Sequence, residues 1–374
     1  LLLDQRGTGR SAAGFRCELD QAATLTTGAV EALGEMLEEC LATIRHDPRL
    51  FSTSPAVGDL DALRRALGAE EWNLYGISYG TRVAQHYARL HPERVRSMVL
   101  DGVVPAELAL GPFIARDAQA ALDAILARCE TDPACSSRYA ELGRKFEDLR
   151  LRLAAGPVSI DVANPATGEI ESRLLGESDL QGVVRLMSYT AATASLLPLA
   201  ISEAHRGEYG MLAAQVDILT RDLAETVSVP MHNSVVCTED VPYFPDDLPV
   251  DPDDVYLGTT IVDSLRAICE IWPAGVIDAG FKEPLEFDGP VLLLSGENDP
   301  VTPPEYAVRV MTAGLGNARH LVGPGQGHGM AGIGCAPRLI AAFVEAASPA
   351  AVDGACLDRE PPTPFFLSKL GPAP

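Results

Sequence analysis

Short apolar runs alternate with amphipathic stretches along the first hundred residues. The apolar runs at 72–77 and 95–100 are strand-like, and they flank a helical pattern at 81–90. Further helical patterning covers 28–45 and a stretch that opens at Ser54-Pro55, where the serine suits the N-cap and the proline the first turn. Strands that alternate with helices in this way predict a parallel sheet with crossover helices.

The rhythm changes after residue 102 and returns after residue 284. Between these points helical stretches predominate, at 112–129, 137–155, 178–188, 194–224 and 258–270, and two strand-like runs, at 158–162 and 170–174, predict a hairpin. Afterwards come strands at 291–294 and 319–322 and helices at 304–313 and 337–347. We therefore predict an α/β core built from 1–102 and 285–374, interrupted by a mainly helical cap at 103–284. An insertion at the carboxyl end of a strand lies over the crevice where such sheets bind ligands.

The composition suits an enzyme with a large core and argues against a nucleic-acid partner. The chain has 374 residues, of which 47% are hydrophobic, enough to bury a sizeable core. Its 52 acidic and 29 basic residues give a formal net charge of -23, which repels a phosphate backbone. Uninterrupted apolar runs are only a few residues long, far short of the ~20 residues that span a bilayer. We expect neither a nucleic-acid partner nor a membrane span.

Eight cysteines fall into neighbouring couples along the chain. The couples are Cys17 with Cys40, Cys129 with Cys135, Cys237 with Cys269, and Cys335 with Cys356. No C-x-x-C occurs and no histidine stands at zinc-ligand spacing near a couple, so we expect neither a metal site nor a cofactor. Pairing of sequential neighbours is the preferred prediction because short loops close easily, and free buried thiols are the alternative. Four bridges would place the protein in an oxidising compartment outside the cytosol.

A G-x-S-x-G pentapeptide, Gly76-Ile77-Ser78-Tyr79-Gly80, lies between the strand-like run and the helical pattern that follows it. A serine on a tight strand-to-helix turn stands above the sheet edge, and glycine is expected on both sides because a Cβ would clash inside the turn. The bare pattern is weak in a chain rich in glycine and serine. Its setting makes Ser78 the candidate nucleophile.

A serine nucleophile needs a general base that is oriented by a carboxylate, and on this kind of turn the acid precedes the histidine in the chain. Asp299 follows the next strand-like run, and His328 lies in a glycine-framed loop after the last one. Both should reach the sheet edge that carries Ser78. Glu297 is the competing acid and His320 the competing base.

The oxyanion of a serine hydrolase is bound by two backbone N–H groups. One comes from the residue after the nucleophile, here Tyr79, and the other from a glycine-rich loop after an earlier strand. Leu1 to Leu3 read as the end of a strand before a loop. We expect the second donor, together with further strands of the sheet, upstream of Leu1.

Several motifs together resemble a known family. They are DQRGTGRS (4–11), GISYGT (76–81), GENDPVTP (296–303) and GHG (327–329). This combination is similar to the α/β-hydrolase exopeptidases related to proline iminopeptidase and the secreted bacterial tripeptidyl aminopeptidases. Cys269 with Trp272-Pro273, and Cys335 soon after the histidine, resemble the tripeptidyl aminopeptidase branch and its C-terminal region. The family also carries a His-Gly-Gly-Pro-Gly-like oxyanion loop, which this chain lacks.

The resemblance implies a serine aminopeptidase that releases single residues or short peptides from a free N-terminus through an acyl-enzyme. Such an enzyme needs carboxylates that face the substrate ammonium group. Glu239 and Asp240, beside Cys237, are the local candidates, and the alternative is that both are solvated carboxylates of a very acidic protein. An esterase with the same triad and a non-catalytic binding protein of this fold are the alternative functions. Paired cysteines and the resemblance together imply a secreted or periplasmic protein.

Overall fold

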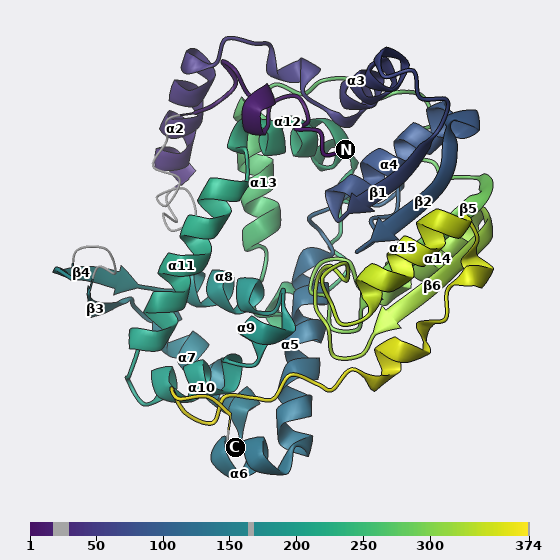
Figure 1. Cartoon of the computed structure of the whole chain (residues 1–374). Helices are drawn as coiled ribbons and strands as arrows, with labels where there is room; N and C mark the ends of the chain where they lie inside the picture. Colours follow the sequence, from purple (N-terminus) through teal and green to yellow (C-terminus); the bar gives the residue numbers. More distant parts are fainter. Residues whose placement is uncertain (18–29, 164–167, 373–374) are drawn as a thin grey trace.

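A parallel sheet forms the core of the computed structural model, which describes residues 1–17, 30–163 and 168–372 (Figure 1). Its strands are β1 (Trp72–Ile77), β2 (Val95–Asp101), β5 (Phe287–Gly296) and β6 (Leu315–Gly323), in the order β1-β2-β5-β6. All three pairings are parallel. The predicted α/β class and mostly parallel sheet are confirmed, whereas Leu1 to Leu3 form no strand.

Helices cover both faces of this sheet because its central strands are apolar on both sides. On one face, Met98 and Leu100 of β2 and Leu293 of β5 pack against helices α3 (Thr53–Ala66), α4 (Tyr79–Leu90) and α14 (Pro304–Gly314). On the other face, Val99 and Leu292 pack against α15 (Ala336–Ala346). Side chains alternate between the two faces of a strand, so neighbouring residues of β2 and β5 pack into two different apolar cores.

The start of α3 differs from the prediction. Ser52 holds the N-cap position and Ser54 lies inside the helix. The amide of Thr53 donates to Glu239 at 2.7 Å. A carboxylate from a distant segment, and not a local side chain, therefore accepts the hydrogen bond of a first-turn amide that has no partner within the helix. The prediction of Ser54 as the N-cap was wrong for this reason.

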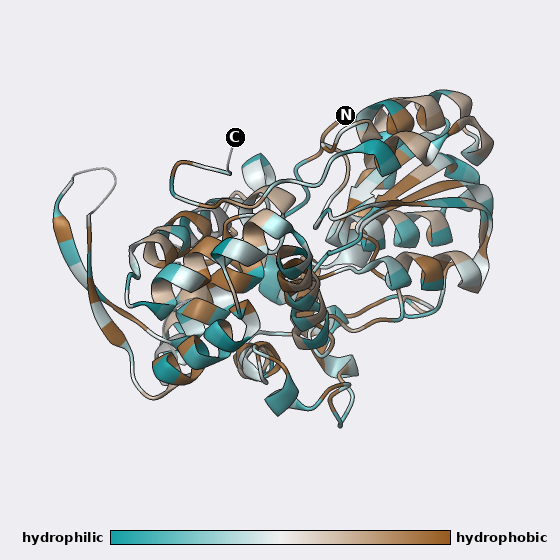
Figure 2. Ribbon diagram, turned by 90° about the horizontal axis from the view of Figure 1, so that it is seen from below, coloured by the Kyte–Doolittle hydropathy of each residue, from teal (hydrophilic) through white to brown (hydrophobic). Residues whose placement is uncertain are grey.

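Residues between β2 and β5 form a mainly helical block. Its helices are α5 (Ile114–Thr131), α6 (Pro133–Arg138), α7 (Leu142–Ala154), α8 (Glu177–Met187), α9 (Ala191–Ala194), α10 (Leu197–His205), α11 (Gly210–Thr226), α12 (Val229–Glu239) and α13 (Thr260–Ile271). The predicted hairpin is present as the antiparallel strands β3 (Val158–Ala163) and β4 (Ile170–Leu175). Asn164-Pro165, in the chain between the two strands, lies outside the described residues. Figure 2 shows the block beside the sheet, with the hairpin projecting away from both.

Two features of the block were not predicted. The helical stretch expected at 194–224 is divided into two helices, α10 and α11. Helix α12 had no sequence signal because the residues from Pro230 to Glu239 are almost all buried, which removes the amphipathic period by which helices are recognised.

The block has its own apolar core, to which the C-terminal tail adds Phe365. The exact borders of the core and cap remain predictions.

The N-terminal segment packs beside the block through α2 (Val30–Thr43), whose Leu37 shares a buried cluster with Trp272. In the described part of the chain, no helix is both long and apolar enough to cross a bilayer.

All eight cysteines are paired, and the predicted pairing of sequential neighbours is confirmed. The bridges are Cys17–Cys40, Cys129–Cys135, Cys237–Cys269 and Cys335–Cys356. The third joins α12 to α13, so it links the segment that carries the acidic pair to its neighbouring helix. Structural disulfides of this kind are typical of oxidising compartments.

We expect the Cys237–Cys269 bridge to contribute more stability than Cys129–Cys135. The two close loops with sequence separations of 32 and 6 residues, and the entropy of loop closure gives about 4 and about 2 kcal/mol. Urea denaturation of the two paired Cys→Ala variants would measure both losses. An equal loss, or a larger one for the short loop, would contradict the expectation.

Candidate active site

Ser78 lies at the carboxyl end of β1, in the turn that leads into α4. Its backbone has φ 53° and ψ -124°, a conformation that is rare for a residue with a side chain. The turn is held by the Ser78 amide, which donates to the Asp101 carbonyl at 2.8 Å, and by Thr81, whose amide donates to the Ser78 carbonyl at 2.9 Å. This is the strained strand-to-helix geometry of a nucleophile turn.

The two glycines that flank the serine have different roles. A Cβ at Gly76 would lie 2.2 Å from the Gly80 carbonyl oxygen, so the turn excludes any larger residue there. A Cβ at Gly80 would meet no atom within 4 Å. The expected clash is therefore confirmed at Gly76 and wrong at Gly80.

Asp299 and His328 are in direct contact. Asp299 is 2% exposed, and its Oδ2 lies 2.8 Å from His328 Nδ1. The Thr302 hydroxyl donates to the same carboxylate oxygen at 2.7 Å, and the amides of Val301 and Thr302 donate to the other oxygen at 2.9 Å each. Burial alone would raise the pKa of Asp299, but His328 and the Thr302 hydrogen bonds outweigh it and lower the pKa. The carboxylate therefore stays ionised and can orient the imidazole.

Thr302 was not among the predicted site residues. Besides its bond to Asp299, its hydroxyl lies 3.1 Å from His328 Nδ1. The signal was present in the sequence, because Thr302 belongs to the GENDPVTP motif, but its role depends on the loop conformation.

The loop of His328 lies beside the serine turn. A Cβ at Gly102, next to the residue that binds the Ser78 amide, would be 3.0 Å from His328 Cε1, and one at Gly329 would be 2.8 Å from Ile77 Cδ1. Among the described residues, however, the Ser78 hydroxyl has no hydrogen bond to His328. Such bonds are often long without substrate and tighten when it binds.

The competing residues lie elsewhere. Glu297 is exposed and accepts a hydrogen bond from the Gly325 amide at 2.7 Å. His320 Nε2 lies 3.0 Å from the Ser295 hydroxyl on the neighbouring strand. In the described part of the chain, neither residue forms a hydrogen bond or an ion pair with Asp299 or His328.

A second group of serine, histidine and aspartate lacks relay geometry. His86 Nε2 lies 2.8 Å from Asp278 Oδ2 and 3.3 Å from the Ser54 hydroxyl. Both contacts use the same ring nitrogen, so the imidazole cannot take a proton from the serine on one side while the acid orients it on the other.

Asp101 holds the chain that follows His328. Its buried carboxylate accepts hydrogen bonds from the amides of Met330, at 2.8 Å, and Ala331, at 2.9 Å, and from the Tyr75 hydroxyl at 3.0 Å. Burial raises the pKa of Asp101, although these donors oppose the effect. Asp101 was not among the predicted site residues.

Tyr189, from the loop between α8 and α9, contacts His328 directly. Its carbonyl accepts the His328 amide at 2.7 Å, and the two rings meet edge to face with centres 5.4 Å apart. A Cβ at Gly327 would lie 2.3 Å from the Tyr189 carbonyl oxygen. Glycine at position 327 thus allows the Tyr189 backbone, which belongs to the helical block, to approach His328.

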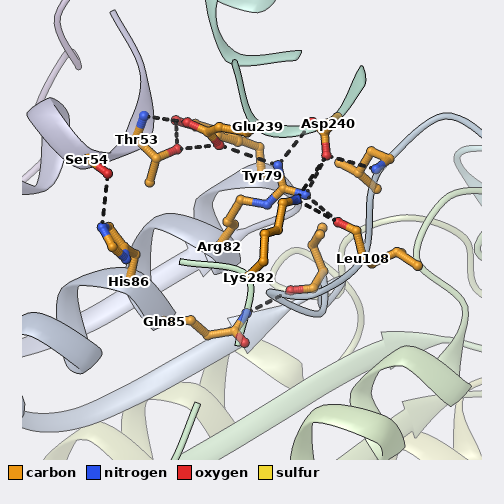
Figure 3. A network of polar contacts seen from close by, with 12 residues as sticks. Thr53, Ser54, Tyr79, Arg82, Gln85, His86, Leu108, Glu239, Asp240 and Lys282 are labelled. Atoms are coloured by element: carbon orange, nitrogen blue, oxygen red, sulfur yellow. Dashed lines mark hydrogen bonds and ion pairs between the residues drawn. The ribbon is translucent and has the colours of Figure 1, made fainter. Parts of the chain in front are cut away.

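Glu239 and Asp240 lie at the end of α12 with no exposed surface (Figure 3). Asp240 pairs with Arg82 of α4, whose Nη2 lies 2.9 Å from Oδ1, and it accepts the Leu110 amide at 2.9 Å. Arg82 lies farther from Glu239, at 3.5 Å. The interpretation of both residues as solvated carboxylates is wrong.

This buried cluster reaches Tyr79, the expected oxyanion donor. Glu239 accepts the Thr53 hydroxyl at 2.9 Å, and that hydroxyl lies 2.8 Å from the Tyr79 hydroxyl. Gln5 donates to the same tyrosine at 3.0 Å. Burial raises the pKa of Glu239, against the effect of Arg82. Lys282 lies 3.7 Å from Asp240, and burial lowers its pKa to about 8.

A family model described as the alpha/beta hydrolase fold matches residues 1–331. The chain therefore belongs to the α/β-hydrolase-fold family, in agreement with its sheet, its serine turn and the order of its candidate residues.

Three known proteins show what the chain is similar to. It is 28% identical over 169 residues to the putative hydrolase YuaR of Escherichia coli (strain K12), over 42% of this chain and 33% of that protein. It is 36% identical over 94 residues to the tripeptidyl aminopeptidase of Streptomyces lividans, over 25% of this chain and 16% of that protein. It is 54% identical over 46 residues to the serine protease Hip1 of Mycobacterium tuberculosis (strain ATCC 25618 / H37Rv), over 12% and 9%. The matched segments cover a third or less of these relatives.

We expect Arg82→Met to destabilise the fold by about 3 to 5 kcal/mol, because it leaves two buried carboxylates without their main cation. Urea denaturation would measure the loss. Arg144→Met is the matched control, since Arg144 pairs with Glu141 and Asp148 on the exposed surface of α7 and exposed pairs contribute little. If the two substitutions had equal effects, the buried cluster would not be a structural centre.

Proposed function

We propose that the protein is a serine exopeptidase that releases single residues or short peptides from free N-termini. The observation that carries the proposal is the hydrogen bond between the ionised carboxylate of Asp299 and His328. The loop of His328 lies beside the strained turn of Ser78. Similarity to a tripeptidyl aminopeptidase and to a serine protease supports peptide substrates over other acyl compounds.

In the proposed mechanism the Ser78 hydroxyl oxygen attacks the scissile carbonyl carbon while His328 Nε2 takes its proton. The Tyr79 amide donates to the resulting oxyanion. Collapse of the tetrahedral intermediate breaks the C–N bond, and the imidazolium gives its proton to the leaving amine. Water then attacks the acyl-enzyme with His328 again as base, which releases the N-terminal product and restores Ser78.

Glu239 is proposed to attract the substrate ammonium group, with Asp240 in support. Asp240 already has Arg82, Lys282 and the Leu110 amide as partners. Glu239 is held by the neutral groups of Thr53 and has Arg82 only at 3.5 Å. A buried carboxylate with a raised pKa gains from a closer cation.

One observation favours an esterase instead. The two carboxylates are balanced by two cations, Arg82 and Lys282, and have no exposed surface. Recognition of an ammonium group there requires the Thr53 and Tyr79 side chains to move, whereas an ester substrate without an ammonium group makes no such demand.

The helical block at 103–284 is proposed to act as a cap over Ser78. The contact of Tyr189 with His328 supports this role, because Tyr189 belongs to the block and His328 is the proposed general base. We also propose a secreted or periplasmic location, on the basis of the four disulfides.

Ser78→Ala should lower turnover by roughly 10⁴-fold or more, since it removes the nucleophile, and leave the unfolding transition in place. A fluorophosphonate should label the wild type at Ser78, as located by mass spectrometry. Ser54→Ala, which removes a hydroxyl that lies 3.3 Å from His86 Nε2, should retain labelling and turnover. Full activity in Ser78→Ala would refute the mechanism.

Blocking the substrate N-terminus should separate the peptidase from the esterase. We expect a peptidyl p-nitroanilide with a free N-terminus to be cleaved at least about 100-fold faster, in kcat/KM, than its acetylated form, because a buried ion pair is lost. Glu239→Gln should reduce this ratio, and Glu147→Gln on α7 should retain it. Equal rates for both forms, with faster cleavage of p-nitrophenyl esters, would favour the esterase.

A further inference from the structure

Arg185 of α8 is a partly buried cation without an acidic partner among the described residues. Its Nη2 donates to the Tyr189 hydroxyl at 2.9 Å, and its guanidinium carbon lies 5.3 Å from the centre of that ring. Its Nε is buried and has no hydrogen-bond partner in the described part of the chain. The Nε of Arg82 is also without a partner among the described residues, but its two Nη atoms are paired with carboxylates. A buried donor without an acceptor is costly, which points to an acceptor that arrives from outside the chain.

A second donor without a partner lies in the same region. Tyr256 is 3% exposed, and its hydroxyl has no partner among the described residues. Tyr256 packs in the same buried cluster as Val184 and Met187 of α8, the helix that carries Arg185. A cationic side chain with an unpartnered Nε and a neutral hydroxyl donor are suited to an anion with several acceptor positions.

Arg185 is connected to His328, the proposed general base, through Tyr189. Tyr189 is the side chain between Arg185 and His328, since it contacts both. His328 delivers the proton to the leaving amine in the proposed mechanism, whereas Tyr79 binds the carbonyl oxygen. A ligand at Arg185 would therefore belong to the leaving group and not to the released N-terminal part.

We propose that Arg185, assisted by the Tyr256 hydroxyl, binds the free C-terminal carboxylate of a short peptide substrate. The inference rests on the proposed exopeptidase function and narrows its substrates to short peptides with both termini free. The planar guanidinium matches a carboxylate with two parallel hydrogen bonds. In a chain with a net charge of -23, a local cation is also needed to offset the repulsion of an anionic end.

The test compares peptides that differ only at the C-terminus. The substrates carry the best acyl part from the p-nitroanilide assay, followed by one, two or three alanines that end in a free acid or in an amide. For the length that fits, we expect the wild type to cleave the acid about 10-fold to 100-fold better than the amide in kcat/KM, the usual range for a charged hydrogen bond. Arg185→Gln should bring this ratio close to one, and Arg185→Lys should give an intermediate ratio.

Two further variants exclude a purely structural role. If Arg185 served only to hold Tyr189, removal of the hydroxyl that it binds, in Tyr189→Phe, would change the ratio as much as Arg185→Gln does. The proposal expects Tyr189→Phe to keep the acid preference. Arg144→Gln, on the exposed surface of α7, should also keep it, and thermal unfolding would confirm that each variant folds.

Failure of this inference and failure of the proposed function give different results. Cleavage of free-N-terminal peptides with no acid preference, or with a preference that survives Arg185→Gln, overturns the inference alone. If no peptide is cleaved, the exopeptidase function fails, and calorimetry with Ser78→Ala decides the inference. Acid peptides that bind about 10-fold tighter than amides, and lose that advantage in Ser78→Ala/Arg185→Gln, support it. Equal binding of acid and amide overturns it.

Discussion

Pairing between β2 and β5 is the constraint on which the candidate site depends. The strands align from Met98 with Val291 to Asp101 with Leu294, although residues 102–286 separate them in the chain. Because the sheet is parallel, the loops that leave β1, β5 and β6 all start from the carboxyl edge. A slip of one residue would exchange the two apolar faces of a strand. Burial on both faces therefore fixes the register and, with it, the positions of the candidate residues.

The same constraint anchors the helical block at this edge, because the chain leaves the sheet after β2 and returns with β5. Two polar contacts then fix the block against the site. Asp240 pairs with Arg82 next to the serine turn, and Tyr189 accepts the amide of His328. A broken buried ion pair leaves an uncompensated charge, so this contact favours one position of the block.

Patterns of adjacent residues predicted the secondary-structure elements that depend mainly on local interactions. The strands at 72–77 and 95–100 have apolar runs bounded by turn signals, and both are present. The prediction failed where a distant residue replaced a local partner, as Glu239 does at the start of α3. It also failed for α12, because a helix that is buried on nearly every side shows no amphipathic period. Both failures involve Glu239, which accepts the amide at the start of α3 and lies at the end of α12.

By itself the sequence determined most of the order of strands and helices and the identity of Ser78, Asp299 and His328 as candidates, and it favoured the pairing of neighbouring cysteines. Periodicity, turn chemistry and short loops are properties of adjacent residues, so they can be read from the chain. Only the tertiary structure decided that the acidic pair is buried against Arg82 and that Tyr189 reaches the histidine. Those contacts join residues far apart in the chain, and they exist because packing of the block against the sheet brings them within hydrogen-bond distance.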